Sequence, residues 1–129
     1  MKKLELQLEF PGKTHDIETH VNDLTIRTSD NLIDPSPGKI FLAGLAACTA
    51  STARGYCEKH GLPLPTGMKA TINYHNEKNI ISEYNCEFIV PTDFPKEKVE
   101  ALIRAAGTCT VKNFWRNPPE FHTSVIASK

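Results

Sequence analysis

Residues 36–61 read SPGKIFLAGLAACTASTARGYCEKHG, and this stretch decides the fold. Ser36 is a good helix N-cap, and Pro37 suits the first helical position because its missing N–H would have no partner there. His60 favours the negative end of a helix and Gly61 suits the position just beyond it, so the predicted helix ends at about His60. Its first half is apolar on every side and rich in Ala and Gly, which predicts a helix that is buried all round.

Before this helix the sequence predicts three strands. Residues 3–10 alternate between apolar and polar side chains, so one strand face is expected to be buried, namely Leu4, Leu6, Leu8 and Phe10. Pro11-Gly12-Lys13 is typical of a turn, and the weaker alternation over residues 17–21 predicts the second arm of a hairpin. Residues 24–28 predict a third short strand.

After the helix the sequence predicts a long hairpin, then helices, then one strand. Residues 68–76 and 80–90 are the two arms, with inner faces formed by Met68, Ala70, Ile72 and Tyr74 and by Ser82, Tyr84, Cys86, Phe88 and Val90. Pro95 begins a helix that Gly107 ends, with Val99, Leu102, Ile103 and Ala106 at helical spacing. Residues 109–116 predict a helical turn and residues 120–127 a closing strand. This order predicts an α+β fold with antiparallel or mixed sheets.

Length and charge limit the classes of function. The chain has 129 residues, which predicts one domain over 1–129. Its 15 basic and 15 acidic residues balance, which argues against nucleic acid or an anionic membrane as partner. No apolar region of the signal-peptide kind follows the two N-terminal lysines, and no apolar run has the length of a membrane span, so a cytoplasmic protein is expected. The sequence predicts no cofactor.

The candidate reactive groups are four cysteines, expected to be thiols in a reducing compartment: Cys48, Cys57, Cys86 and Cys109. Cys86 lies between two aromatic residues on a strand face that resembles core, which predicts a structural role. Cys57 follows Cys48 by nine residues and so lies on the opposite side of the helix, where it is expected to be a bystander. Cys109 follows the helix-ending Gly107, and a position at the start of a helical turn favours a thiolate.

The segment Pro35-Ser36-Pro37, followed after two residues by IFLAGLAACTA at 40–50, resembles the OsmC/Ohr family of osmotically inducible and organic hydroperoxide resistance proteins. Members carry a proline, an apolar Leu/Ala/Gly run and a cysteine in the central helix. A second family cysteine lies much further along the chain, often followed by Pro-Val. Cys109, followed by Thr110-Val111, has the corresponding spacing from Cys48.

The resemblance implies an OsmC-like fold, with sheets around a long buried central helix, in an intertwined homodimer whose sites lie at the subunit interface. It also implies a thiol peroxidase of peroxiredoxin type in oxidative-stress defence, with Cys48 as peroxidatic and Cys109 as resolving thiol. The Cys48 thiolate would be oxidised to a sulfenic acid and then form a disulfide with Cys109. An external dithiol would reduce that disulfide.

An apolar pocket would favour organic hydroperoxides, because their tails gain by burial. The candidate lining residues are Phe41, Leu45, Phe114 and Trp115. Ordinary core packing is the simpler interpretation of all four.

The sequence departs from the family at one informative place. Peroxidase members carry a glutamate just after the motif proline, which orients an arginine that stabilises the thiolate. Here Gly38 and Lys39 occupy those positions. Arg27 is the candidate for the family arginine, although a strand arginine that faces solvent is the simpler interpretation.

Three functions therefore stay open. The first is reduction of hydroperoxides by Cys48 and Cys109. The second is a non-catalytic dimer that binds a small apolar molecule at its interface, favoured by the missing glutamate. The third is another thiol chemistry, such as disulfide exchange or the sensing of electrophiles. The five histidines are scattered, so no metal site is expected.

Overall fold

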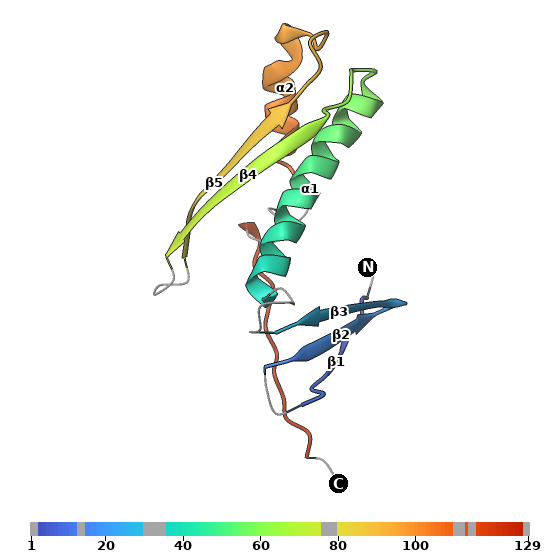
Figure 1. Cartoon of the computed structure of the whole chain (residues 1–129), viewed down its shortest axis with the longest axis vertical. Helices are drawn as coiled ribbons and strands as arrows, with labels where there is room; N and C mark the ends of the chain where they lie inside the picture. The colour runs from blue at the N-terminus through green and yellow to red at the C-terminus, as the bar shows by residue number, and fades with distance from the viewer. Residues whose placement is uncertain are drawn as a thin grey trace. The chain divides into compact units, whose positions relative to one another are not determined.

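The computed structural model describes residues 3–12, 15–29, 36–75, 80–109, 113 and 116–127. The chain forms two compact units, Met1–Gly44 and Leu45–Lys129. The presence of two sheets and two α-helices agrees with the predicted α+β class. The elements are, in order, β1 (Gln7–Glu9), β2 (Ile17–Val21), β3 (Leu24–Thr28), α1 (Pro37–Lys59), β4 (Gly67–His75), β5 (Ile80–Ile89), the 3-10 helix η1 (Lys96–Lys98) and α2 (Val99–Ala106) (Figure 1).

The first sheet is antiparallel, in the order β1-β2-β3. Strands β2 and β3 form as predicted, but β1 covers only residues 7–9 of the predicted 3–10. The register explains the difference: Gln7 pairs with His20, so residues before Leu6 would run past the end of β2. The predicted buried face was wrong for the single chain, because Leu4, Leu6, Leu8 and Phe10 are all exposed. Lys13 of the predicted turn lies outside the described residues.

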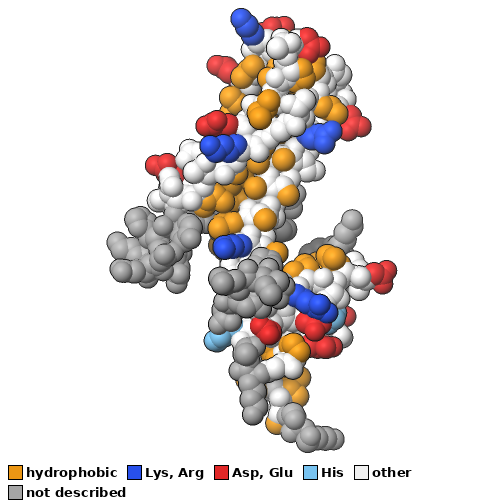
Figure 2. Space-filling view, viewed as in Figure 1, with side chains coloured by type: hydrophobic (Ala, Val, Ile, Leu, Met, Phe, Trp, Pro, Cys, Tyr) orange, Lys and Arg blue, Asp and Glu red, His pale blue; other side chains and the backbone are white. Residues whose placement is uncertain are grey.

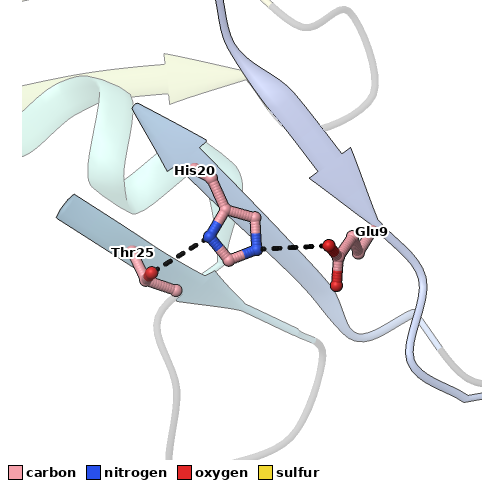
Figure 3. A network of polar contacts seen from close by, with 3 residues as sticks. All are labelled: Glu9, His20 and Thr25. Carbon is pink, nitrogen blue, oxygen red and sulfur yellow. Dashed lines mark hydrogen bonds and ion pairs between the residues drawn. The ribbon is translucent and has the colours of Figure 1, made fainter. Parts of the chain in front are cut away.

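A small polar network joins the three strands of this sheet (Figure 3). His20 Nδ1 lies 3.1 Å from Thr25 Oγ1, and His20 Nε2 lies 3.8 Å from Glu9 Oε1. Among the described residues, His20 Nε2 is shielded from water without a hydrogen-bond partner, since the Glu9 carboxylate is too distant for one. The contact with Glu9 is therefore electrostatic and requires a protonated imidazole.

Helix α1 begins and ends as the sequence predicts. The Lys39 N–H donates to Ser36 Oγ at 3.3 Å, which confirms Ser36 as the N-cap. At the other end, Gly61 has φ +65°, and its N–H donates to Glu58 O. The Leu62 N–H donates to Cys57 O at 2.9 Å. These two bonds form a Schellman motif, the termination that glycine at this position favours.

The predicted burial of α1 was wrong for the single chain. Only one stripe of the helix is buried, at every fourth residue: Leu45, Thr49, Ala53 and Cys57. Phe41 is 51% exposed, and Ala47 and Gly55 are also exposed. In one chain the core contacts of α1 come from one side only, so composition alone overestimates how much of this helix is covered.

Strands β4 and β5 form the predicted long antiparallel hairpin, with Gly67 paired to Ile89. The turn at 76–79 lies outside the described residues. One predicted inner residue, Ser82, is exposed. The register shifts there from Asn73–Glu83 to Tyr74–Ile81, so Ser82 is the extra residue of a β-bulge and its Oγ donates to Asn73 O at 3.1 Å. The described residues form only antiparallel pairs, and mixed pairing is not seen among them.

The core of the second unit lies where the end of α1 meets α2 and the inner face of β5 (Figure 1). Its buried members are Ala53, Cys57, Phe94, Leu102 and Ala106. Figure 2 shows hydrophobic side chains gathered on the drawn face of the second unit, with charged side chains towards its borders.

The second helical segment departs from the prediction in two respects. It begins with the 3-10 turn η1 after Pro95, and α2 starts only at Val99. Leu102 and Ala106 are buried as predicted, but Val99 and Ile103 are exposed because the core covers only one narrow side of this short helix.

The predicted closing strand at 120–127 is not formed. Residues 118–127 have no regular secondary structure, and Phe121, Val125 and Ile126 are almost fully exposed. An apolar alternating segment becomes a strand only where a neighbouring strand edge supplies hydrogen bonds, and this segment pairs with none of the described strands. Within the described residues, no helix combines the length and apolarity needed to cross a bilayer.

Candidate functional site

The four cysteines differ in burial, and all are thiols. Cys57 is 0% exposed and Cys109 is 1% exposed, whereas Cys48 and Cys86 are half-buried. Cys57 belongs to the core, and burial raises the pKa of its thiol. That environment agrees with the predicted bystander role and leaves three cysteines as candidates for chemistry.

Cys48 lies in the middle of α1 beside the buried stripe. It precedes the buried Thr49, and successive helical side chains point about 100° apart, so Cys48 faces away from the Thr49 side chain. One turn later the Thr52 hydroxyl donates to Cys48 O at 2.9 Å. Cys48 is therefore held on a regular, well-bonded part of the helix.

Cys109 lies in the segment that follows α2. Gly107 caps that helix, and the Asn113 N–H donates to Cys109 O at 3.2 Å. This bond spans four residues, as in an α-helical turn, and agrees with the prediction that Cys109 opens one. The Cys109 side chain is buried, and its Sγ lies 3.8 Å from Thr49 Oγ1.

Thr49 is the centre of this contact. Its hydroxyl donates to Leu45 O at 3.0 Å. Two further polar atoms lie close to Thr49 Oγ1. These are Tyr84 Oη at 3.0 Å and Cys109 Sγ at 3.8 Å. Thr49 Oγ1 therefore joins the Tyr84 hydroxyl and the Cys109 thiol in one group of polar contacts.

Tyr84 lies beside Thr49 and also beside a third thiol, that of Cys86. Burial is the main cause that raises the pKa of Tyr84 to about 12. A hydrogen bond with the Cys86 side chain and the negative charges of Cys86 and Cys109 raise that pKa too, whereas the bond with Thr49 lowers it. The phenol therefore stays protonated at neutral pH.

An open pocket of about 190 Å³ gives access to this group of side chains. Thr49, Tyr84, Cys86 and Phe88 line it, together with Ile103 and Gly107 from the second helix and its cap. Cys86 was predicted to be structural. The structure agrees that its face is half-buried, but places its side chain in the wall of a pocket rather than inside the core.

The sequence model of the OsmC-like protein family matches residues 28–124. The chain belongs to the OsmC-like protein family. The match confirms the resemblance seen in the central helix, and it extends over both candidate cysteines. A search of curated protein sequences finds no match.

Solved OsmC-like structures have the same fold. An OsmC-like protein from Mycoplasma pneumoniae has a TM-score of 0.69 at 15% identity, over 91% of this chain and 89% of that chain. An OsmC-like protein of unknown function from Vibrio cholerae has a TM-score of 0.62 at 13% identity, over 88% and 93%. An OsmC-like hydroperoxide resistance protein from Jannaschia sp. CCS1 has a TM-score of 0.55 at 14% identity, over 96% and 92%. At these identities the likeness shows the fold alone.

The other predicted site residues of this OsmC-like chain are not brought together by the described contacts. Arg27 is exposed on β3, opposite Glu18, in the first compact unit. Leu45 is buried, and Phe41, one helical turn before it, is half-exposed. The predicted pocket residues Phe114 and Trp115 lie outside the described residues.

Sequence reasoning missed Thr49 and Tyr84 as site residues, and it assigned Cys86 to the core. Thr49 follows the motif cysteine, and a threonine on the buried stripe of a helix needs hydrogen-bond partners. Tyr84 and Cys86 share one strand face, which the alternation of the strand did predict. The missing information was that this face meets the Thr49 side of α1.

Proposed function

We propose that this OsmC-like chain reduces hydroperoxides, with Cys48 as peroxidatic thiol and Cys109 as resolving thiol. The observation that carries the proposal is the contact between Cys109 Sγ and Thr49 Oγ1, the side chain next to Cys48. It brings the second thiol to the turn of α1 that carries the first. The name of the Jannaschia relative, a hydroperoxide resistance protein, supports the same activity.

The reaction has three steps whose atoms balance. The Cys48 thiolate attacks the distal oxygen of the hydroperoxide; the O–O bond breaks, an alcohol leaves, and Cys48 becomes a sulfenic acid. The Cys109 sulfur then attacks the Cys48 sulfur, forming a disulfide and releasing water. An external dithiol reduces the disulfide and is itself oxidised to a disulfide.

The resting geometry of Cys109 suits a resolving thiol. Its Sγ lies beside Thr49 Oγ1 and is only 1% exposed, so the thiol is shielded from solvent in the resting structure. Cys48 and Thr49 diverge by about 100° around the helix, so the second step requires the Cys109 side chain to leave Thr49 and turn towards Cys48. Cys109 lies beyond the end of α2, where such a movement leaves the helix itself intact.

The proposal includes the homodimer. Outside its buried stripe α1 exposes small residues, among them Ala43, Ala47, Ser51 and Gly55. Small side chains allow another backbone to approach closely, and a second copy over this face would bury the part of α1 that a single chain leaves exposed. Arg27 is the proposed cation for the Cys48 thiolate, because it is the one arginine that precedes α1 in the sequence. Gly38 and Lys39 replace the family glutamate that would orient it.

The test is consumption of cumene hydroperoxide in the presence of a dithiol. Cys48→Ser is expected to abolish turnover, and Cys109→Ser to allow a first reaction but not sustained cycling. Cys57→Ala is the matched control, since Cys57 lies on the same helix but inside the core. Unchanged peroxide consumption by Cys48→Ser would refute the proposed function.

The absence of the family glutamate favours a second candidate, the binding of a small apolar molecule without catalysis. Gly38 and Lys39 supply no carboxylate to orient a cation near Cys48, while Phe41 is half-exposed on the same helix. This candidate predicts that Cys48→Ser retains an apolar ligand seen by native mass spectrometry, and that the purified wild-type protein consumes no peroxide.

A further inference from the structure

We propose that Cys86 is a third redox residue, which takes over the disulfide from Cys48 and presents it to the external reductant as a Cys86–Cys109 disulfide. The inference rests on the proposed function for the source of the oxidation. The pairing of Cys86 with Cys109, however, is a property of the chain that can be tested without any peroxide.

The two sulfur atoms border one chain of polar contacts. The Cys86 side chain hydrogen-bonds with the Tyr84 hydroxyl, Tyr84 Oη lies 3.0 Å from Thr49 Oγ1, and Thr49 Oγ1 lies 3.8 Å from Cys109 Sγ. Cys86 and Tyr84 are two residues apart on β5, and their side chains line one pocket together with Thr49. Cys57, by contrast, lies in a cluster of buried apolar residues.

The thiols of Cys86 and Cys109 differ in how accessible they are from solvent. Cys109 is 1% exposed, so an external dithiol cannot reach its sulfur in the resting structure. Cys86 is half-buried and lines the open pocket of about 190 Å³. A disulfide that includes Cys86 is therefore open to attack from solvent, whereas the Cys109 sulfur is enclosed. Thiol–disulfide exchange depends on access to the attacked sulfur, so within a Cys86–Cys109 disulfide the external dithiol is expected to attack Cys86.

The backbone makes Cys109 the thiol that exchanges partners. Cys48 is fixed in the middle of α1, and Cys86 lies within β5, paired with Ala70 of β4. Cys109 lies beyond the last residue of α2, separated from it by the cap Gly107 and by Thr108. A rotation about Gly107 and Thr108 would carry the Cys109 sulfur towards either partner while both partners stay in place.

The exchange step balances without another reagent. The Cys86 thiolate attacks Cys109 Sγ in the Cys48–Cys109 disulfide; one S–S bond breaks, one forms, and Cys48 leaves as a thiolate that is ready for the next hydroperoxide. The Tyr84 hydroxyl, protonated at neutral pH, donates to the sulfur that carries the negative charge and so positions it. The external dithiol then reduces the Cys86–Cys109 disulfide to two thiols and becomes a disulfide itself.

The experiment uses the full-length Cys48→Ser variant, which lacks the proposed peroxidatic thiol. It is treated with oxidised dithiothreitol, alkylated, digested with trypsin and analysed by mass spectrometry. The sequence separates the cysteines cleanly, because Cys86 falls in peptide 79–96, Cys109 in 105–112 and Cys57 in 55–59. The expected product links peptides 79–96 and 105–112. It disappears in Cys48→Ser/Cys86→Ser and persists in Cys48→Ser/Cys57→Ala.

Two results would overturn the inference. One is that Cys86 and Cys109 both stay fully alkylated by the reagent after treatment with oxidised dithiothreitol. The other is a product that links Cys109 to Cys57 instead. Neither result depends on peroxide, so they are distinct from failure of the proposed function, which would be seen as peroxide consumption by Cys48→Ser.

A second measurement follows the wild-type chain during turnover with cumene hydroperoxide and dithiothreitol. In Cys86→Ser the Cys48–Cys109 disulfide, seen as peptides 40–54 and 105–112 linked together, is expected to accumulate more than tenfold over wild type, because its exit is blocked. Cys57→Ala is expected to match wild type. Equal amounts of this disulfide in Cys86→Ser and wild type would show that Cys86 takes no part in the exchange.

Discussion

Cys109 Sγ lies 3.8 Å from Thr49 Oγ1, and Thr49 is the residue that follows Cys48 on α1. The contact joins the segment after the second helix to the centre of the first. It also gives the resolving thiol of the proposed cycle a defined resting place, beside a hydroxyl that donates to Leu45 O. Thr49 is thus the link between the motif cysteine and the rest of the site.

The contacts of Thr49 predict the effect of the Thr49→Val substitution, which keeps the branched shape of the side chain but removes its hydroxyl. We expect the free energy of unfolding to fall by about 1–2 kcal/mol, because the Tyr84 O–H and the Cys109 S–H lose their partner. Urea denaturation measures the change. Thr52→Val is the matched control, because the Thr52 hydroxyl bonds to the helix backbone at Cys48 O. Equal losses in the two variants would show that the contacts of Thr49 with Tyr84 and Cys109 contribute nothing.

The raised pKa of Tyr84 predicts that one tyrosine side chain deprotonates only at high pH in an alkaline titration. The chain has three tyrosines, and the ultraviolet absorbance of tyrosinate is expected to show one component near pH 12, the value to which burial raises the pKa of Tyr84. Tyr84→Phe should remove that component, and Tyr56→Phe should retain it. A late component that survives in Tyr84→Phe would contradict the assignment.

The same shift has a consequence for stability. The folded-state pKa of Tyr84 lies above its ordinary value of 10, so the buried phenol stabilises the folded state fully below pH 10. Its contribution is lost as the pH rises from 10 to about 12, because the unfolded chain deprotonates first. We expect wild type to lose about 1–2 kcal/mol more than Tyr84→Phe over that window, with the partial burial of Tyr84 taken into account. Denaturation at both pH values measures the difference.

The backbone conformation of Gly61, just after the end of α1, predicts how substitutions at this position change stability. Its φ of +65° is a left-handed conformation that costs an alanine about 1–2 kcal/mol. Gly61→Ala is therefore expected to lower the free energy of unfolding by about that amount, measured by urea denaturation. Gly61→Asn is the control, because asparagine tolerates this conformation, and it should cost clearly less. The reverse order of the two variants would exclude a Schellman termination.

Elements with local signals could be predicted from the sequence. The ends of α1 depend on Ser36 and Gly61, which act on the backbone next to them. The β4–β5 hairpin depends on alternation along two adjacent segments. Both were therefore correct nearly to the residue, apart from the bulge at Ser82, which only the pairing register reveals.

Features that depend on distant partners could not be predicted in this way. The strand over residues 3–10 shortens because β2 ends, and residues 120–127 form no strand among the described elements because none pairs with them. The composition of α1 indicates a covered helix but cannot say which residues one chain covers. The candidate site also depends on distant partners, because Thr49, Tyr84, Cys86 and Cys109 come from three distant segments. The family resemblance pointed to Cys109, but no local pattern pointed to its neighbours.

The most informative experiment on the proposed peroxidase is a single turnover without reductant. Fully reduced protein is mixed with a stoichiometric amount of cumene hydroperoxide, quenched with acid, alkylated and mapped by mass spectrometry. We predict that peptide 40–54, which contains Cys48, is recovered linked to peptide 105–112 at early times, and that Cys57→Ala behaves in the same way. Recovery of fully alkylated Cys48, with the hydroperoxide left unreduced, would contradict thiol-dependent peroxide reduction by this chain.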